Sequence, residues 1–468
     1  MTPARNPPTN PLLVVLGSTG TGKSDLAVDL ASRFDGEIIN ADAMQLYKGL
    51  PILTNKMKAP DRRGIPHHLL GHISPLDPPW NVDVFRREAS VILQDIRNRG
   101  KLPILVGGTH YYLDALLFPD VVLDTLDQNR DADDNSQPPH HPLLDEPTHV
   151  LLEELRKCDP AMAERWHPND RRKILRSLEI FLNTGRTASD LYAEQERRRR
   201  AAHRNFGPWD KLLFWVHTDR DVLCRRLDSR VDAMLEAGLL DEVRQLYALR
   251  RESSADFSNI DVTKGIWQSI GYRQFEPYVR ALEDTTSSTS SSTQKPDLPS
   301  LQATALEEVK AATRRYASHQ TRWIRYKQTR RLRDQGPEAI SSLYLLDSTD
   351  PSLFRSRVLD PAASVVDRFL RGLPRSLPAD LSPRASEILA ATWRHPTDPP
   401  ETPRKHFCDT CQATLLSDEA WRKHVGGVAH RRATVKKKKL ALVSCEPRTR
   451  TTTPEADRSS SPDIASLF

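Results

Sequence analysis

The sequence predicts an α/β protein in which a parallel β-sheet has helices on both faces. Short apolar runs typical of buried strands occur at residues 12–16, 36–40, 102–106 and 212–217. Between them, residues 23–34 and 82–99 place apolar side chains at helical spacing. Strands that alternate with helices pair in parallel, because each helix carries the chain back to the starting edge of the sheet.

A phosphate-binding loop directly follows the first predicted strand. Residues 17–24 read GSTGTGKS, which is the G-x-x-x-x-G-K-[ST] pattern. Backbone N–H groups of such a turn and the positive end of the next helix surround an anion, and the Ser24 hydroxyl can hold Mg²⁺. A turn without a ligand would leave Lys23 facing an anion-shaped hollow. We therefore predict a P-loop NTPase-like fold, with phosphate bound by Gly17, Thr19, Gly20, Thr21, Gly22, Lys23 and Ser24.

Two further predicted strands end in polar residues. Asp42 follows strand 36–40, and Thr109 follows two glycines after strand 102–106. Ligands of open α/β sheets lie at the carboxyl ends of the strands, so both residues are candidates for the site. Asp42 can coordinate Mg²⁺, accept a proton from an amine or cap a helix, and these roles stay open. Gln45 suits a bidentate contact with an adenine edge.

The C-terminal region carries a metal-binding pattern. The spacing Cys408-x₂-Cys411-x₁₂-His424-x₅-His430 predicts a Cys₂His₂ site for structural Zn²⁺. The alternative is a pair of free thiols with two incidental histidines. The basic run that follows, HRRATVKKKKL, suits either an RNA contact or a nuclear address, and the two uses cannot be separated.

Composition limits the class of protein and its compartment. The 468 residues include 68 Lys+Arg and have a net charge of +6, and basic clusters near 194–204, 310–333 and 431–439 suit a polyanion, or are solvated helix faces. Five cysteines are too few for a disulfide scaffold, which indicates a reducing compartment. No apolar run approaches the roughly 18 residues of a membrane helix. We expect a cytoplasmic protein without membrane contact, with mitochondrial or nuclear pools as alternatives.

Composition also suggests boundaries along the chain. We expect a disordered N-terminus and a core divided by an insertion, whose acidic, Pro-rich start at 124–149 is disordered and whose remainder is helical. A Ser/Thr-rich linker, a connector, the zinc unit and a disordered tail complete the chain. The expected ranges are 1–10 (N-terminus), 11–123 and 205–345 (core), 124–204 (insertion), 284–300 (linker), 346–403 (connector), 404–433 (finger) and 434–468 (tail).

Several segments occur in a fixed order along the chain: GSTGTGKS, ADAMQLY, TNK, GIPHHLLG, VGGTHYY, DPAMAERWHPNDRRKILRSLE, DSRVDAMLEAGLLDEV, WQSIGYRQFEPY and TRRYASHQTRWIR. Together they resemble one family, the tRNA dimethylallyltransferases (tRNA isopentenyltransferases). The resemblance covers about residues 12–326, and the C-terminal unit suggests the eukaryotic branch.

The resemblance implies a prenyl transfer. A five-carbon group would move from dimethylallyl diphosphate to N6 of the adenosine just 3′ of the anticodon, and the phosphate loop would hold the diphosphate. Asp42 matches the general base, while Thr109 and Arg230 match groups that, with Lys23 and Mg²⁺ at Ser24, neutralise the leaving diphosphate. On local grounds alone, Arg230 would instead form a surface ion pair with a neighbouring aspartate.

The resemblance also implies contacts with the tRNA anticodon stem-loop. Gln45 would hold an adenine that has left the base stack. The family usually has Ser after the general base, so Ala43 loses a hydroxyl contact here. Lys173 can equally be part of a polar helix face. The implied tRNA-binding residues are Asp42, Ala43, Met44, Gln45, Arg172, Lys173, Arg176, Gln268 and Arg322, joined by Gly271, Tyr272, Arg314, Trp323 and Arg325.

Three other functions remain open at this stage. An adenylate isopentenyltransferase would share the phosphate loop and the base, although a small acceptor would not need the finger. A P-loop kinase would need a Walker-B carboxylate, for which Asp219 after strand 212–217 is the candidate. A zinc-finger RNA-binding protein on an inactive P-loop scaffold would leave Asp42 and Thr109 unexplained. For the transferase we expect a monomer.

Overall fold

The computed structural model describes residues 6–118, 141–201, 210–252, 261–286, 297–393, 406–415 and 418–443. These residues form two compact units. One comprises the described residues of Met1–Gln128 and Leu191–Pro396, and the other those of Asn129–Asp190 and Thr397–Phe468. The expectations of disorder at 124–140 and of a tail after 443 lie outside the described residues, as does the middle of the linker expected at 284–300. The described ends of that linker are helical instead, because α10 extends to Thr286 and α11 begins at Leu298.

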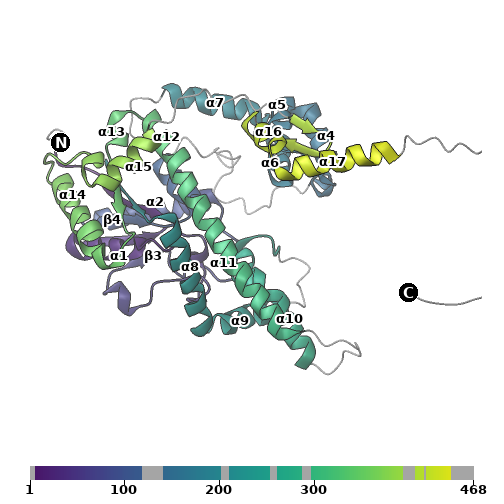
Figure 1. Ribbon diagram of the computed structural model, residues 1–468. Coiled ribbons are helices and arrows are strands. Elements are labelled where there is room, and N and C mark those ends of the chain that lie inside the picture. Colours follow the sequence, from purple (N-terminus) through teal and green to yellow (C-terminus); the bar gives the residue numbers. More distant parts are fainter. Residues whose placement is uncertain are drawn as a thin grey trace, which may run out of the picture. The chain divides into compact units, whose positions relative to one another are not determined.

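The first unit contains a six-stranded parallel sheet, which confirms the predicted α/β class (Figure 1). The order β3-β2-β4-β1-β5-β6 places β1 between β4 and β5, with Val15 opposite both Val106 and Phe214. The strands are β1 Pro11–Gly17, β2 Gly36–Asn40, β3 His67–His68, β4 Leu102–Val106, β5 Asp210–His217 and β6 Leu343–Asp347. The three loops of the predicted site therefore leave neighbouring strands at the same edge.

Both faces of the sheet are covered, which explains why its strands are apolar throughout. Leu12, Val14 and Leu16 of β1 belong to one buried cluster, whereas Leu13 and Val15 belong to another. Helices α1 Lys23–Arg33 and α14 Asp360–Leu370 contribute to the second cluster. The first cluster takes side chains from α2 Val82–Asn98, α3 His110–Leu117, α8 Arg220–Glu236, α9 Leu239–Glu252, α10 Tyr272–Thr286, α11 Leu298–Trp323, α12 Thr329–Asp334, α13 Pro337–Ile340 and α15 Pro383–Trp393.

Two expected helices are divided in the structure. The helical pattern at 221–246 becomes α8 and α9, because Gly238 between them has φ 105°, a conformation that favours glycine. The pattern at 301–333 becomes α11, a π-helical turn at Ile324–Gln328 and α12. The π turn directly follows Trp323, which is part of the surface described below.

The connector expected at 346–403 is wrong for the part that the structure describes. Strand β6 ends at Asp347, and the following residues form the π turn Arg355–Leu359 and helices α14 and α15. Val358, Val366 and Leu389 are fully buried. Pro378 and Pro383, two of the prolines that suggested a connector, occupy the first turns of helices, where proline costs no hydrogen bond.

The second unit combines helices of the insertion with a small finger that contains two strands and two helices. The helices α4 Thr148–Cys158, α5 Pro160–Arg165 and α6 Arg171–Thr184 lie in the segment expected to be helical, and α7 Ala188–Ala201 spans the boundary between the units. Residues 141–149, expected to be disordered, contain a 3₁₀ turn and the start of α4. The finger consists of β7 His406–Cys408, β8 Ala413–Leu415, α16 Asp418–Val425 and α17 Val428–Val443. Among the described helices, none has the length and apolar character that crossing a bilayer requires.

Candidate active site

The phosphate loop joins β1 to α1 through glycines in left-handed conformations. Gly20 has φ 82° and Gly22 has φ 87°. A Cβ atom at Gly22 would lie 2.7 Å from the Phe354 ring, so a side chain there would be both strained and crowded. Gly22 is also the N-cap of α1 and brings no capping side chain, which leaves the first N–H groups of the helix directed at the loop.

Lys23 is the buried cation of this loop. Its Nζ donates a hydrogen bond to the Ser18 carbonyl at 2.7 Å. Burial lowers the pKa of Lys23 to about 8, the charge of Asp42 opposes this shift and that of Arg230 adds to it. A buried ammonium next to an uncapped helix start is suited to an anion, because desolvation makes each charge contact stronger.

Arg230 points into the same loop from α8. Its Nη1 donates to Thr19 Oγ1 at 3.1 Å, and its buried Nε has no hydrogen-bond partner among the described residues. The expected surface alternative is wrong, since Asp228 pairs with Arg314 and Asp232 with Lys310. Burial lowers the pKa of the Arg230 guanidinium, and Asp42 opposes the shift.

Asp42 stands at the end of β2, within the electrostatic reach of both cations. Its Oδ1 accepts the backbone N–H of Met44 at 3.0 Å. Burial raises the pKa of Asp42, while that N–H group and the charges of Lys23 and Arg230 act in the opposite direction. A buried carboxylate with a raised pKa and a neighbouring anion site has the properties of a general base.

Thr109 connects the ends of β4 and β2. Its Oγ1 accepts the backbone N–H of Ala43 at 2.9 Å. A Cβ atom at Gly107 would lie 2.2 Å from the Ala41 carbonyl oxygen, so only glycine allows this approach. Although Ala43 lacks the hydroxyl that the family usually has here, Thr109 still fixes its backbone.

Two buried residues of this region, Gln320 and His110, were not predicted from the sequence. Gln320 on α11 accepts the N–H of Thr19 at 2.8 Å and donates to the Gly108 carbonyl at 2.9 Å. His110 has no hydrogen-bond partner at either ring nitrogen among the described residues, and burial, then the charge of Lys23, lowers its pKa to about 3. The only signal for Gln320 was its place within TRRYASHQTRW, and for His110 its place after Thr109.

The expected tRNA-binding residues are distributed over both units. Met44 and Gln45 lie beside Asp42, and the Gln45 Nε2 donates to the carbonyls of Thr54 at 3.3 Å and Asn55 at 3.1 Å. Gln268 and Arg322 are exposed on the first unit. The remaining three belong to α6 of the second unit, where Lys173 pairs with Asp170 and Arg176 with Glu179, and Arg172 is exposed.

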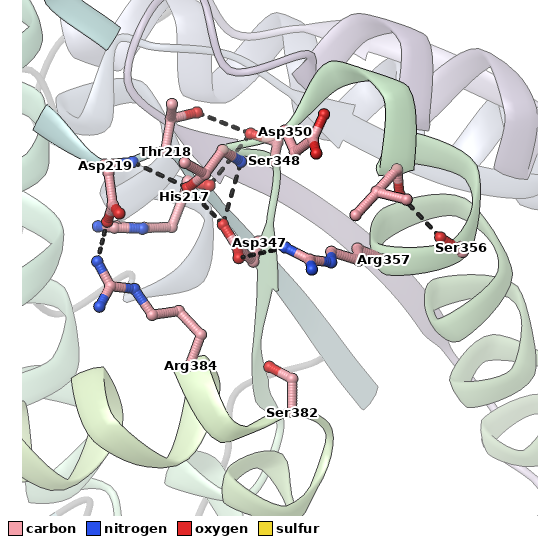
Figure 2. Close-up of polar contacts among 12 residues, drawn as sticks. His217, Thr218, Asp219, Asp347, Ser348, Asp350, Ser356, Arg357, Ser382 and Arg384 are labelled. Carbon is pink, nitrogen blue, oxygen red and sulfur yellow. Dashed lines mark hydrogen bonds and ion pairs between the residues drawn. The ribbon is translucent and has the colours of Figure 1, made fainter. Parts of the chain in front are cut away.

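The carboxyl ends of β5 and β6 hold a polar network that involves the Walker-B candidate (Figure 2). Asp219 forms an ion pair with Arg384, and its N–H donates to Thr349 Oγ1 at 3.1 Å. Arg226 bonds to the carbonyls of Gly20 and Ser348, both at 3.1 Å. The Arg226 bonds connect the phosphate loop to the end of β6. The Asp219 carboxylate is occupied by its ion pair with Arg384, so it serves a structural role rather than that of a nucleotide-site carboxylate.

The four residues of the predicted zinc site come together in the finger. Their ligand atoms all lie within 4.8 Å of one another, with Cys408 Sγ 3.4 Å from His430 Nδ1 and His424 Nε2 3.1 Å from the same nitrogen. Cys411 Sγ lies 3.5 Å from His430 Nδ1. Two sulfur and two nitrogen donors at such spacing fit tetrahedral Zn²⁺.

The fold and this geometry define a P-loop protein whose phosphate site faces a buried carboxylate. The model of the IPP transferase family matches residues 45–327. The Schizosaccharomyces pombe tRNA dimethylallyltransferase is 43% identical over 317 residues, 67% of this chain and 68% of that protein. The human tRNA dimethylallyltransferase is 35% identical over 92% of this chain and 87% of its own.

A solved structure agrees with these relatives. It is described as a eukaryotic dimethylallyltransferase acting on tRNA, and it matches with a TM-score of 0.72 and 30% identity over 93% of this chain and 99% of its own. The chain belongs to the IPP transferase family, and the resemblance to the eukaryotic tRNA dimethylallyltransferases is confirmed.

Proposed function

We propose that the protein transfers a dimethylallyl group from dimethylallyl diphosphate to N6 of the adenosine 3′ of the tRNA anticodon. The names of its relatives support this activity. The observation that carries it is the arrangement of three charged side chains at one edge of the sheet. Lys23 and Arg230 both bond to the loop after β1, and Asp42 follows β2 at the same edge, where the charges of the two cations lower its pKa against the effect of burial. A base and an anion site at this spacing suit an alkyl transfer from a diphosphate.

The reaction needs a base because the N6 lone pair is conjugated into the purine ring. Asp42 accepts the N6 proton while nitrogen forms its bond to the allylic carbon. The carbon–oxygen bond to the diphosphate breaks, and its electron pair stays on the diphosphate oxygen. Lys23 and Arg230 neutralise that developing charge, and because they are already buried, little reorganisation is required.

Both proposed metals have fitting residues. Ser24, partly buried in the first turn of α1, offers a hydroxyl oxygen of the kind that Mg²⁺ accepts beside phosphate oxygens, and Mg²⁺ would help to neutralise the diphosphate. The Cys408 cluster would hold structural Zn²⁺. We infer that the finger adds affinity for tRNA, since the exposed basic side chains of Arg431 and Arg432 follow it on α17.

The remaining proposals concern the setting of the enzyme. Substrate contacts by Arg172, Lys173, Arg176, Gln268 and Arg322 are part of the proposal, supported by their exposure and charge or hydrogen-bonding capacity. The free thiols among the described cysteines support a reducing compartment, which suits the cytoplasm and also mitochondrial or nuclear pools. We propose that the enzyme acts as a monomer, because the residues of the phosphate site all come from one chain.

One assay tests the function. The protein is incubated with labelled dimethylallyl diphosphate, Mg²⁺ and either total tRNA or AMP. Label in tRNA is expected. Label in AMP would identify an adenylate isopentenyltransferase, and ATP consumption without either product would identify a kinase or NTPase.

A further inference from the structure

An aromatic pair, the exposed Tyr111 and the partly buried Trp323, lies next to the candidate site on the first unit. Tyr111, the second residue of α3, is 59% exposed. Its ring centroid is 4.5 Å from that of Trp323, at an interplanar angle of 53°. The Nζ of Lys327 lies 3.8 Å from the centroid of the Trp323 ring. Two aromatic rings and a cation thus share one surface.

A buried carboxylate holds the Trp323 ring of this pair. The Trp323 Nε1 donates to Asp114 Oδ2 at 2.7 Å, and Asp114 is only 2% exposed. The same carboxylate accepts Gln328 Nε2 at 3.0 Å and forms an ion pair with Arg331. These bonds span the π turn after Trp323, so the ring has one fixed orientation before any ligand binds.

The same two elements build the acceptor side of the site. Tyr111 is two residues from Thr109, which fixes the backbone of Ala43 beside Asp42. Trp323 is one turn of α11 beyond Gln320, which bonds to Gly108 and to the phosphate loop. The aromatic pair therefore lies along the continuation of the surface that carries the base.

Exposed aromatic rings with adjacent cations are the usual platform for single-stranded nucleic acid, because every base has a face that stacks. Apolar packing alone does not account for Tyr111, since more than half of its surface is open to solvent. Arg322, next to Trp323 in the chain, is also exposed and provides charge for a phosphate.

We propose that the exposed Tyr111 ring, supported from behind by Trp323, stacks with a nucleobase of the anticodon loop that adjoins the acceptor adenosine. This inference rests on the proposed function. An adenosine that leaves the stack uncovers the faces of its neighbours, and a rigid aromatic platform beside the site replaces one of those lost contacts. The platform thereby lowers the cost of extruding the acceptor base.

The first test compares Tyr111→Ala with Tyr111→Phe, which keeps the ring and serves as the matched control. Binding of an anticodon stem-loop is measured by fluorescence anisotropy, and kinetics are measured for both substrates. Tyr111→Ala is expected to weaken stem-loop binding about 10-fold, whereas Tyr111→Phe stays within about twofold of wild type. The KM for dimethylallyl diphosphate is expected to stay unchanged in both variants.

The second test removes the base instead of the side chain. Stem-loops with one abasic nucleotide on either side of the acceptor adenosine are bound to wild type and to Tyr111→Ala. The effect of Tyr111→Ala should disappear with one of these RNAs and persist with the other. Equal binding by wild type and Tyr111→Ala, or an effect that no abasic position removes, would overturn the platform and leave the pair as a surface for a protein partner.

Different results would contradict the prenyl-transfer proposal and the proposed stacking by Tyr111. If wild type binds the stem-loop but transfers no label to it, the prenyl-transfer proposal fails, while the binding comparison still decides the role of Tyr111. If wild type transfers label and Tyr111→Ala binds RNA as well as wild type does, only the platform fails.

Discussion

Gln320 accepts a hydrogen bond from the backbone N–H of Thr19 at 2.8 Å. The other end of the same amide donates to the Gly108 carbonyl at 2.9 Å. One buried side chain of α11 therefore links the loop after β1 to the loop after β4. It sets the spacing between the diphosphate site and Thr109, which fixes the segment that carries Asp42.

The Gln320 link predicts a loss in the chemical step when it is removed. Gln320→Leu leaves the Thr19 N–H and the Gly108 carbonyl without partners, and we expect kcat to fall at least about 10-fold. The matched control is Ser318→Ala on the same helix, which removes only a bond to Arg314 within α11. Steady-state kinetics with saturating tRNA, together with a melting temperature for each variant, separate positioning from unfolding. Unchanged kcat in Gln320→Leu would rule out the positioning role.

Asp42→Asn tests the base and carries a second consequence for stability. We expect turnover to fall about 10²- to 10⁴-fold, because the amide cannot accept the N6 proton, while tRNA binding remains near wild type. Filter binding and single-turnover transfer measure the two effects separately. Wild-type turnover in Asp42→Asn would remove Asp42 from the base role.

The raised pKa of Asp42 gives the sign of the stability change. Burial favours the neutral acid, so this group stabilises the fold below its unfolded pKa of 3.8, and the contribution is lost as the pH rises through the folded value. The amide that Asp42→Asn introduces would resemble the neutral acid at every pH. Asp42→Asn should therefore melt at a higher temperature than wild type at neutral pH, and the difference should narrow as the pH falls.

Lys23 predicts a pH dependence of diphosphate binding. Its pKa of about 8 means that the ammonium is lost between neutral and mildly alkaline pH in the free enzyme. From pH 7 to pH 9 we expect the affinity for inorganic diphosphate to fall about 10-fold more in wild type than in Lys23→Arg, whose cation persists. Calorimetric titration measures the affinity of wild type and of Lys23→Arg at both pH values. Ionisation of diphosphate itself affects the two proteins equally, so it cancels in the comparison. Parallel pH profiles would contradict the assignment.

Features formed by residues close together in the chain could be predicted from the sequence, whereas contacts between distant segments could not. The phosphate loop was predictable because its strand, glycines and helix are contiguous, and the zinc ligands because their spacing is short. Arg230 was ambiguous, since its partner Thr19 lies far away in the chain while two aspartates are close. Strand β6 was not predicted, because Leu343–Asp347 form a short apolar run at the end of the expected core with no periodicity of their own, and only the structure shows Leu345 fully buried.

Zinc should matter for tRNA affinity more than for chemistry. Cys408→Ser removes one of the four donors, and since structural zinc sites couple metal binding to folding, we expect the finger to lose its structure. The KM for tRNA should rise about 10-fold, while kcat at saturating tRNA stays within about twofold. Cys224→Ser, a free thiol outside the cluster, is the control. Equal tRNA binding with and without zinc would reject the role.

A hydrogen bond from His167 attaches the finger to the helical insertion of the second unit, and we expect tRNA binding to depend on this attachment. The His167 Nδ1 accepts the N–H of Asn169 at 3.1 Å, so the ring proton is on Nε2, which donates to the Thr414 carbonyl at 3.2 Å. The bond joins β8 to the loop before α6. His167→Ala should raise the KM for tRNA in the same direction as Cys408→Ser but leave zinc content unchanged, because no zinc donor is removed. Amide exchange in β8 should accelerate, since the Thr414 carbonyl of this strand loses its hydrogen-bond donor.

His167→Gln, whose amide nitrogen can replace the Nε2 donor, is the matched variant and should recover part of the protection. Slow exchange in β8 of His167→Ala would show that the finger keeps its place without this bond, and the affinity contributed by the finger would then depend on zinc alone.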